Sequence, residues 1–184
     1  MKNIVITGVS TGIGYSSAKK LTKDGYRVFG SVRKEEDGSK LEKEFGENFH
    51  SLIFDVRDEE AIKKAALKVK EIVGDSGIDC LINNSGIALG GPILHLSKEV
   101  FKEQFDVNLF GVVSVTNIFS KLLGAYKESS HSGKIIMISS VSGKRSYPFV
   151  GPYTASKHAL EGLSDSLRRE LMIYDIDVIL VEPG

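Results

Sequence analysis

Six short apolar runs alternate with longer amphipathic stretches along this chain of 184 residues. The runs are rich in Ile and Val, are bounded by Gly, Asp or Asn, and cover residues 3–7, 27–32, 50–55, 78–83, 134–139 and 176–181. Runs of this length and composition are typical of strands that are buried on both faces. Stretches with helical periodicity separate them, at residues 13–24, 58–73, 97–126 (one helix or two) and 153–174. Because crossovers between parallel strands are right-handed, this order predicts a single α/β domain, residues 1–184, built on a doubly wound parallel sheet.

Composition argues against several classes of function. The chain carries 24 basic and 24 acidic residues, so it has no net field to attract nucleic acid or an anionic membrane. No apolar run approaches the roughly 20 residues of a membrane span, and no basic leader with an apolar segment opens the chain. The single cysteine, Cys80, lies in an apolar run, and we interpret it as a small strand residue in a reducing compartment. We expect a cytoplasmic protein with no nucleic-acid or membrane partner.

A glycine-rich loop joins the first apolar run to the first helical stretch. Its three glycines follow the spacing G-x-x-x-G-x-G, which permits a tight turn, close approach of a pyrophosphate and close helix packing. The start of the helix then presents free N–H groups to an anion. A plain strand-to-helix turn is the alternative, but the position at the start of a βαβ unit favours a dinucleotide site. The expected cofactor-binding residues of this loop are Gly8, Ser10, Thr11, Gly12, Ile13 and Gly14.

The end of the second apolar run indicates which dinucleotide binds. An NAD site usually has an acidic residue there that binds the ribose 2′-hydroxyl. Val32 occupies that position here, and Arg33 and Lys34 follow it. Because a guanidinium forms charge-assisted bonds to a 2′-phosphate, Arg33 predicts NADP(H). The acidic residues at 35–37 leave NAD(H) open as the alternative, and they also fit a solvated charge run that opens a surface helix.

Tyr153, Lys157 and Ser140 form the candidate catalytic group. A tyrosine has an ordinary pKa near 10, and a lysine four residues later on a helix lies on the same face, where its charge favours phenolate. Tyr153 then protonates a carbonyl oxygen, or deprotonates an alcohol in reverse, and Ser140 orients the substrate oxygen at the carboxyl end of its strand. The alternatives are a helix-surface Tyr–Lys pair and a serine that caps a strand. Ser139 and Ser142 fit the spacing less well.

Together these motifs resemble the short-chain dehydrogenase/reductase family, whose fold is a Rossmann fold. The resemblance runs from residue 2 to residue 184 and is carried by residues 7–14, 83–86, 107–108, 140, 153–157 and 183–184. One motif departs slightly, since the family's Asn-Asn-Ala-Gly is Asn-Asn-Ser-Gly here. The resemblance implies that Asn108 holds a water that relays protons between Lys157 and solvent. It also implies further cofactor contacts, which we assign to Asp55, Val56, Asn83, Ser85, Gly86, Tyr153, Lys157, Pro183 and Gly184.

The resemblance also bears on the chain's end and on its assembly. The chain stops at residues 183–184, just past the last apolar run, with nothing to cover that part of the sheet. Family members continue with a threonine-bearing turn, a segment over the substrate and a final strand, so we expect a missing C-terminal segment. The family also implies self-association through the helices at 97–126 and 153–174, as a homodimer or homotetramer.

Two apolar stretches, residues 87–92 and 146–152, are expected to border the substrate. They favour a lipophilic carbonyl or secondary alcohol and resemble the steroid, retinoid and carbonyl reductase branch of the family, although ordinary loop packing explains them equally well. The predicted function is that of an NADP(H)-dependent oxidoreductase. The alternatives are a 3-oxoacyl thioester reductase and a non-catalytic NADP-binding sensor, whose mark would be loss of the Tyr–Lys pair.

Overall fold

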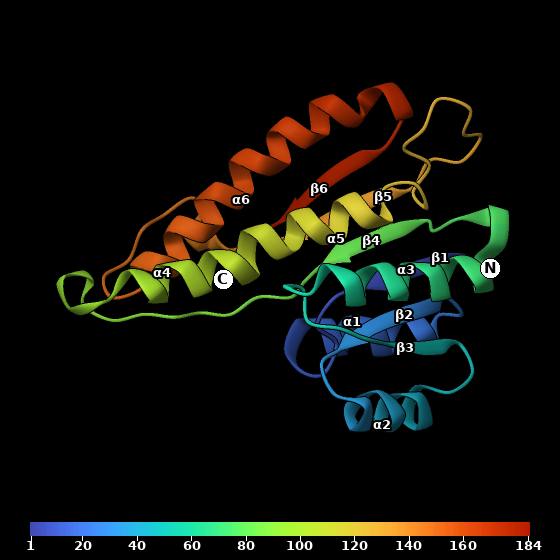
Figure 1. Ribbon diagram of the computed structural model, residues 1–184, viewed down its shortest axis with the longest axis horizontal. Coiled ribbons are helices and arrows are strands. Elements are labelled where there is room, and N and C mark those ends of the chain that lie inside the picture. Colours follow the sequence, from blue (N-terminus) through green and yellow to red (C-terminus); the bar gives the residue numbers. More distant parts are fainter.

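The computed structural model describes residues 1–184 as one parallel sheet with helices on both faces (Figure 1). The strands are β1 (Asn3–Ile6), β2 (Arg27–Val32), β3 (Phe49–Ile53), β4 (Cys80–Asn83), β5 (Lys134–Ile138) and β6 (Asp177–Val181). Their order is β3-β2-β1-β4-β5-β6, and every neighbouring pair is parallel. The predicted strands and the doubly wound fold are confirmed, with strand ends that differ by no more than two residues.

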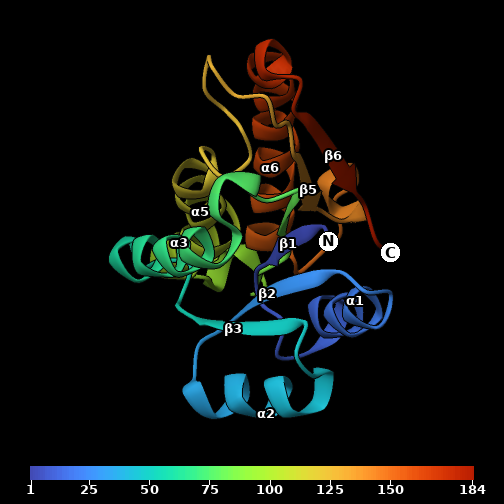
Figure 2. The same ribbon diagram turned by 90° about the vertical axis from the view of Figure 1, so that its right-hand side faces the viewer.

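The helices are α1 (Gly12–Lys23), α2 (Glu35–Phe45), α3 (Glu59–Val73), α4 (Lys98–Phe105), α5 (Gly111–Phe119) and α6 (Gly151–Glu170). Ala18 of α1 and Leu41 of α2 belong to one core cluster. The other cluster joins Ile62 of α3, Phe119 of α5 and Leu160 of α6 on the opposite face of the sheet (Figure 2). On the face of α1 and α2, β6 is not covered, and its Ile179 and Val181 stay 40% and 41% exposed.

Three helical predictions needed correction. Helix α2 was not among the helices predicted from apolar periodicity, because only Gly38 and Leu41 are buried in it, but it starts at Glu35, where the charged run indicated the start of a surface helix. The stretch predicted as one helix or two at 97–126 forms two, α4 and α5. It ends at Phe119, because the following turns include Gly124 with a φ of 94°, which a helix does not accept. A π-helical turn at Asp106–Phe110 joins α4 to α5. Helix α6 starts two residues before its prediction, with a proline in its first turn, and ends four residues earlier.

Two further observations concern solvent and membrane. None of the helices is both long and apolar enough to cross a bilayer. The Cys80 thiol is free and half-buried at the start of β4, where burial and the neighbouring Asp79 raise its pKa to about 12. The thiol therefore stays protonated at neutral pH, as expected of a small strand residue rather than a nucleophile.

Candidate active site

A cavity of about 610 Å³ opens where the carboxyl ends of the strands meet. The strand order reverses beside β1, since β2 and β3 lie on one side of it and β4 to β6 on the other. Such a switch point is the usual ligand site of an open α/β sheet. Most predicted site residues line this cavity, namely Gly8, Ser10, Thr11, Ile13, Arg33, Asp55, Val56, Ser85, Gly86, Ser140, Tyr153, Lys157, Pro183 and Gly184. Four do not line it, namely Gly12, Gly14, Asn83 and Asn108.

The glycine loop is packed so tightly at Gly8 and Gly14 that neither position has room for a side chain. Gly8 has a φ of 70°, and its N–H donates to Ser31 Oγ at 2.9 Å. A Cβ on Gly14 would lie 2.2 Å from the Gly8 carbonyl oxygen and 2.4 Å from Asn84 Nδ2. Helix α1 follows with Thr11 at its N-cap, and no side chain caps its first turn. The N–H groups of that turn therefore remain available to an anion in the cavity.

Arg57 is a cavity residue that the sequence analysis missed. Its Nε donates to Asp55 Oδ1 at 2.9 Å and its Nη2 to Asp55 Oδ2 at 2.8 Å, and both residues line the cavity with Arg33. Hydrogen bonds from Arg57, helped by the charges of Arg57 and Arg33, lower the pKa of Asp55 despite its partial burial. Lys34, the other cation considered, starts α2 outside the cavity. The signal for Arg57 was an arginine two residues past Asp55, at the end of a strand.

Lys157 and Tyr153 lie one turn apart near the start of α6. The Lys157 Nζ lies 5.7 Å from the centroid of the Tyr153 ring and donates to the Ile138 carbonyl at 2.7 Å. Lys157 is only 5% exposed, and burial lowers its pKa to about 8, partly opposed by the charge of Glu161. Ammonium and neutral amine therefore interconvert close to neutral pH at this position.

Ser140 follows β5 and borders the same cavity. Its Oγ accepts a hydrogen bond from the N–H of Ser142 at 3.1 Å, which leaves the hydroxyl hydrogen free for another acceptor. Ser142 is buried away from the cavity, whereas Ser139 borders it. The Ser139 Oγ, however, lies against Gly143 and has no hydrogen-bond partner. Of the three serines, Ser140 has the hydroxyl best placed for a substrate.

Asn108 lies behind the cavity, in the π-helical turn. Its Oδ1 accepts from the N–H of Ile87 at 2.9 Å, and its Nδ2 donates to the Ile87 carbonyl at 3.0 Å and to Ser156 Oγ at 3.1 Å. The side chain thus ties the segment after β4 to α6, and both amide hydrogens are used. Any contact with a relay water must therefore go through an oxygen of Asn108.

Two adjacent asparagines stand at the end of β4, Asn83 as its last residue and Asn84 just after it, and only Asn84 lines the cavity. Asn83 is buried and donates to Thr116 Oγ1 at 3.0 Å, which joins β4 to α5. Asn84 lines the cavity, and its Nδ2 donates to the carbonyls of Thr7 at 2.8 Å and Gly8 at 2.9 Å. The Asn83 side chain therefore lies outside the cavity and bonds β4 to α5, whereas the Asn84 side chain holds the glycine loop through two hydrogen bonds.

Comparisons with known proteins agree with this geometry. A relative at 46% identity over 184 residues is an NADPH-dependent 3-dehydrocapnine reductase from Ornithobacterium rhinotracheale, in which the match covers all of this chain and 65% of that protein. The Bos taurus protein named dehydrogenase/reductase SDR family member 9 is 40% identical, with all of this chain and 56% of that protein covered. This chain therefore spans less than two thirds of the length of these two curated relatives.

Solved structures and a family model complete the comparison. The closed form of a serine dehydrogenase complexed with NADP⁺ superposes with a TM-score of 0.90 at 28% identity, covering 99% of this chain and 71% of that one. The model of the short chain dehydrogenase family matches residues 2–184. With a doubly wound parallel sheet, a glycine loop and a Tyr–Lys pair on one cavity, the chain belongs to the short-chain dehydrogenase family.

Proposed function

We propose that the protein is an NADP(H)-dependent oxidoreductase that interconverts a carbonyl and a secondary alcohol. The observation that carries this proposal is the convergence of Tyr153, Lys157 and Ser140 on the cavity that the glycine loop and Arg33 also line. The named relative that is an NADPH-dependent reductase and the neighbour complexed with NADP⁺ both support it.

The residues present fit a dinucleotide phosphate. Gly8 and Gly14 keep side chains out of the loop, and the first turn of α1 leaves its N–H groups free for the pyrophosphate. Arg33 and Arg57 bring two guanidinium groups to the same cavity, where a 2′-phosphate would find charge-assisted donors. When bound, NADPH supplies the hydride.

Protein groups handle the proton and the orientation of the substrate. The Tyr153 hydroxyl donates its proton to the substrate oxygen in reduction and accepts one in oxidation. The buried Lys157 ammonium favours the phenolate left behind, and the free Ser140 hydroxyl hydrogen orients the same substrate oxygen. Asn108 completes the proposed group by binding a water of the proton relay through one of its oxygens.

The two apolar stretches, residues 87–92 and 146–152, support a lipophilic substrate. Gly91 N–H donates to the Phe149 carbonyl at 2.6 Å, so the two apolar stretches predicted to border the substrate do meet. Ile87 and Ala88 of the first stretch line the cavity, whereas no residue of the second stretch does, and its Phe149 and Tyr147 are 63% and 49% exposed. A retinoid or steroid ketone is therefore our first choice of substrate, and a 3-oxoacyl thioester is the alternative. Turnover of the thioester alone in a substrate panel would overturn this choice.

The catalytic assignment is tested with Tyr153→Phe, which removes only the hydroxyl. We expect a loss of roughly 10²–10⁴-fold in kcat with unchanged NADPH affinity, the usual contribution of a general acid. Tyr126→Phe, which makes the same change on an exposed ring beyond α5, serves as the control. Unchanged turnover in Tyr153→Phe would refute the assignment.

The cofactor is tested by calorimetric titration of the protein with NADPH and with NADH. We expect preference for NADPH, and in Arg33→Ala a loss of roughly tenfold or more in NADPH affinity with little change for NADH. Lys34→Ala, the neighbouring cation outside the cavity, should leave both affinities unchanged. Preference for NADH in the native protein would contradict the assignment.

We also propose that the protein self-associates and is located in the cytoplasm. We expect a dimer at least, formed through α4–α5 and α6, where Phe110 is 56% exposed between α4 and α5. A monomeric sedimentation profile at micromolar concentration would contradict this. We place the protein in the cytoplasm, as its single unpaired cysteine favours a reducing compartment.

A further inference from the structure

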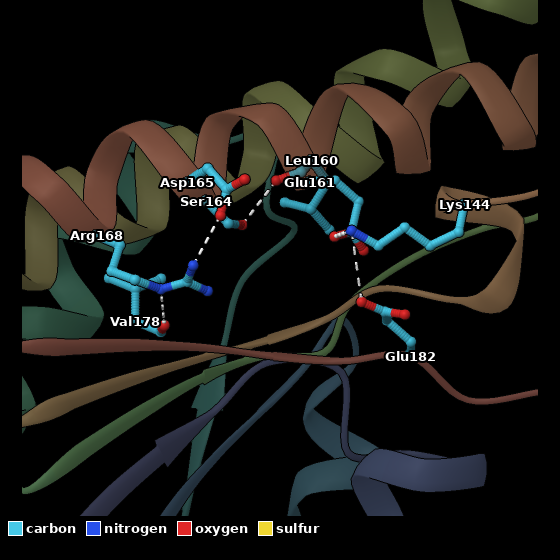
Figure 3. A network of polar contacts seen from close by, with 8 residues as sticks. All are labelled: Lys144, Leu160, Glu161, Ser164, Asp165, Arg168, Val178 and Glu182. Carbon is cyan, nitrogen blue, oxygen red and sulfur yellow. Dashed lines mark hydrogen bonds and ion pairs between the residues drawn. The ribbon is translucent and has the colours of Figure 1, made fainter.

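Glu161 is a buried carboxylate one helical turn beyond Lys157 on α6. It is 6% exposed, and neither of its oxygens accepts a hydrogen bond. The Lys144 Nζ lies 2.8 Å from Oε2, outside hydrogen-bond geometry (Figure 3). Lys144, which is half-exposed, is the one ion-pair partner of this carboxylate. Burying a carboxylate with so little support is costly, and an apolar residue would fill the site at a lower cost in stability. Its presence behind the catalytic lysine therefore calls for a functional reason.

The Glu161 carboxylate packs against the segment that carries Ser140. A Cβ on Gly143 would lie 2.8 Å from Ser139 Oγ and 2.9 Å from Glu161 Oε1, so these two oxygens abut the same point of the backbone. Any side chain at position 143 would push this segment away from α6. The close packing thus holds the Ser140 segment directly against the helix of Tyr153 and Lys157.

Lys144 extends this contact to the end of the chain. Its Nζ also lies 3.7 Å from Glu182 Oε1, and the adjacent Pro183 carbonyl accepts a hydrogen bond from Val141 N–H at 3.0 Å (Figure 3). Glu161, Lys144 and Glu182 therefore join three segments that border the cavity. The Glu161 contact, helped by Glu182, raises the pKa of Lys144 and keeps it charged.

Glu161 is the acidic residue that acts on the pKa of Lys157. Asp165, the next acidic residue on α6, is paired with Arg168, whose Nη1 donates to it at 2.7 Å. Arg168 also donates through Nε to the Val178 carbonyl at 2.9 Å, so this pair is directed toward β6 (Figure 3). Burial is the cause that lowers the pKa of Lys157, and the Glu161 charge is the one that raises it.

We propose that Glu161 is a positioning residue, whose carboxylate keeps the Lys157 ammonium charged and, with Lys144, holds the Ser140 segment against α6. The effect of Glu161 on catalysis rests on the proposed function. Its effect on the charge of Lys157 does not. Glu161 touches neither substrate nor cofactor in this arrangement. It acts on the reaction through Lys157 and through the placement of Ser140.

The test is a carbon-13 NMR titration of the lysine ε-carbons in the intact protein, with Lys157 assigned by its missing signal in Lys157→Met. In Glu161→Gln we expect the Lys157 midpoint to move to lower pH by about one pH unit, since a nearby negative charge is lost without a change of shape. Asp165→Asn, an equal charge change one turn further on, is the control and should leave the midpoint in place. An unmoved midpoint in Glu161→Gln would overturn the proposal.

A second variant, Lys144→Met, tests the same proposal if Glu161→Gln fails to fold. Lys144→Met replaces a half-exposed side chain and leaves Glu161 without its other cation, so the Lys157 midpoint should move to higher pH. A shift to lower pH, or none, would count against the proposal.

Turnover separates this inference from the proposed function. In Glu161→Gln the basic limb of kcat/KM for carbonyl reduction should move to lower pH, and Glu161→Asp, which keeps the charge, should restore it. Loss of turnover without any shift of the Lys157 midpoint or of this limb would show a merely structural role and overturn the proposal. If the native protein shows no reductase turnover but the Lys157 midpoint still shifts in Glu161→Gln, the proposed function is refuted and the electrostatic part of the inference is upheld.

Discussion

The buried Lys157 ammonium should lower the stability of the folded chain at neutral pH. The residue is 5% exposed, and the one hydrogen bond of its ammonium runs from Nζ to the Ile138 carbonyl at 2.7 Å. Burial lowers its pKa from 10.5 to about 8. Replacing it by methionine, which has a similar length and no charge, removes the cost of desolvating the ammonium and leaves the Ile138 carbonyl without this donor.

The sign and the size of the effect follow from the two pKa values. Below pH 8 the proton is bound in both states, and the cost to the folded state is on the order of 3 kcal/mol. Between pH 8 and pH 10.5 the unfolded chain still holds the proton that the folded chain has released, so the free energy of unfolding rises with pH. From pH 7 to pH 9.5 this single group should contribute a rise of about 2 kcal/mol.

Urea unfolding of the native chain and Lys157→Met at pH 7 and pH 9.5 measures this contribution. At pH 7 we expect the variant to be up to about 2 kcal/mol more stable, after subtraction of about 1–3 kcal/mol for the unpaired carbonyl. At pH 9.5 that advantage should shrink by about 2 kcal/mol, whatever the carbonyl costs. A difference that is the same at both pH values would refute the reasoning.

Lys134→Met is the matched control for this titration. Lys134 is exposed and paired with Asp177 on the neighbouring strand, and this hydrogen-bonded pair raises its pKa. A raised pKa contributes stability that is fully present below the ordinary value of 10.5 and is lost only above it. The control should therefore be slightly less stable than the native chain, by the same amount at both pH values.

The remaining predictions concern packing. Gly14→Ala places a Cβ 2.2 Å from the Gly8 carbonyl oxygen and should lower NADPH affinity at least roughly tenfold by calorimetry while destabilising the chain by about 1–3 kcal/mol. Gly162→Ala on α6 meets nothing within 4 Å and should instead stabilise the chain by roughly 0.5–1 kcal/mol in urea unfolding. Phe119→Ala empties a fully buried site between α5 and the sheet and should cost about 3–5 kcal/mol in the same assay. Destabilisation by Gly162→Ala, or a neutral result for either of the other two, would contradict these packing arguments.

The strands were predictable because their sequence pattern and their burial coincide. Parallel strands covered on both faces need apolar runs bounded by turn residues, and all six runs became strands. Apolar periodicity did not predict helix α2, because this helix is stabilised by packing on the edge strand β3 rather than by an apolar stripe. The packing is close, since a Cβ on Gly38 would lie 2.9 Å from Ser51 of β3. The π-helical turn around Asn108 depends on side-chain bonds to the distant residues Ile87 and Ser156, which no local pattern reveals.

Site residues that belong to a single local motif could be predicted from the sequence. Site residues that reach the cavity only because two distant segments of the chain meet could not. The glycine loop and the Tyr–Lys spacing are local, so their residues reached the cavity as expected, apart from glycines that shape it from behind. Arg57 and Asn84 are in the cavity because of bonds to Asp55 and to the glycine loop, and these depend on how neighbouring strands end. Arg57 does not stand out in the sequence, and the Asn-Asn-Ser-Gly motif does not tell which of its two asparagines reaches the cavity.

The buried face of α6 shows what a reading of periodicity leaves out. Its buried residues are Pro152, Thr154, Ser156, Lys157, Leu160, Glu161 and Ser164. Periodicity assigns polar residues of a surface helix to solvent, yet here most of the face turned inward is polar. Each such residue weakens the core, so a helix that keeps them buried retains them for another reason, and local rules fail most often at functional sites. Lys157 and Glu161 are the two charged residues on that face. In the proposed mechanism Lys157 supplies the cation that Tyr153 needs and Glu161 keeps it charged. Their burial costs stability, and the Lys157→Met titration measures the part of that cost that Lys157 carries.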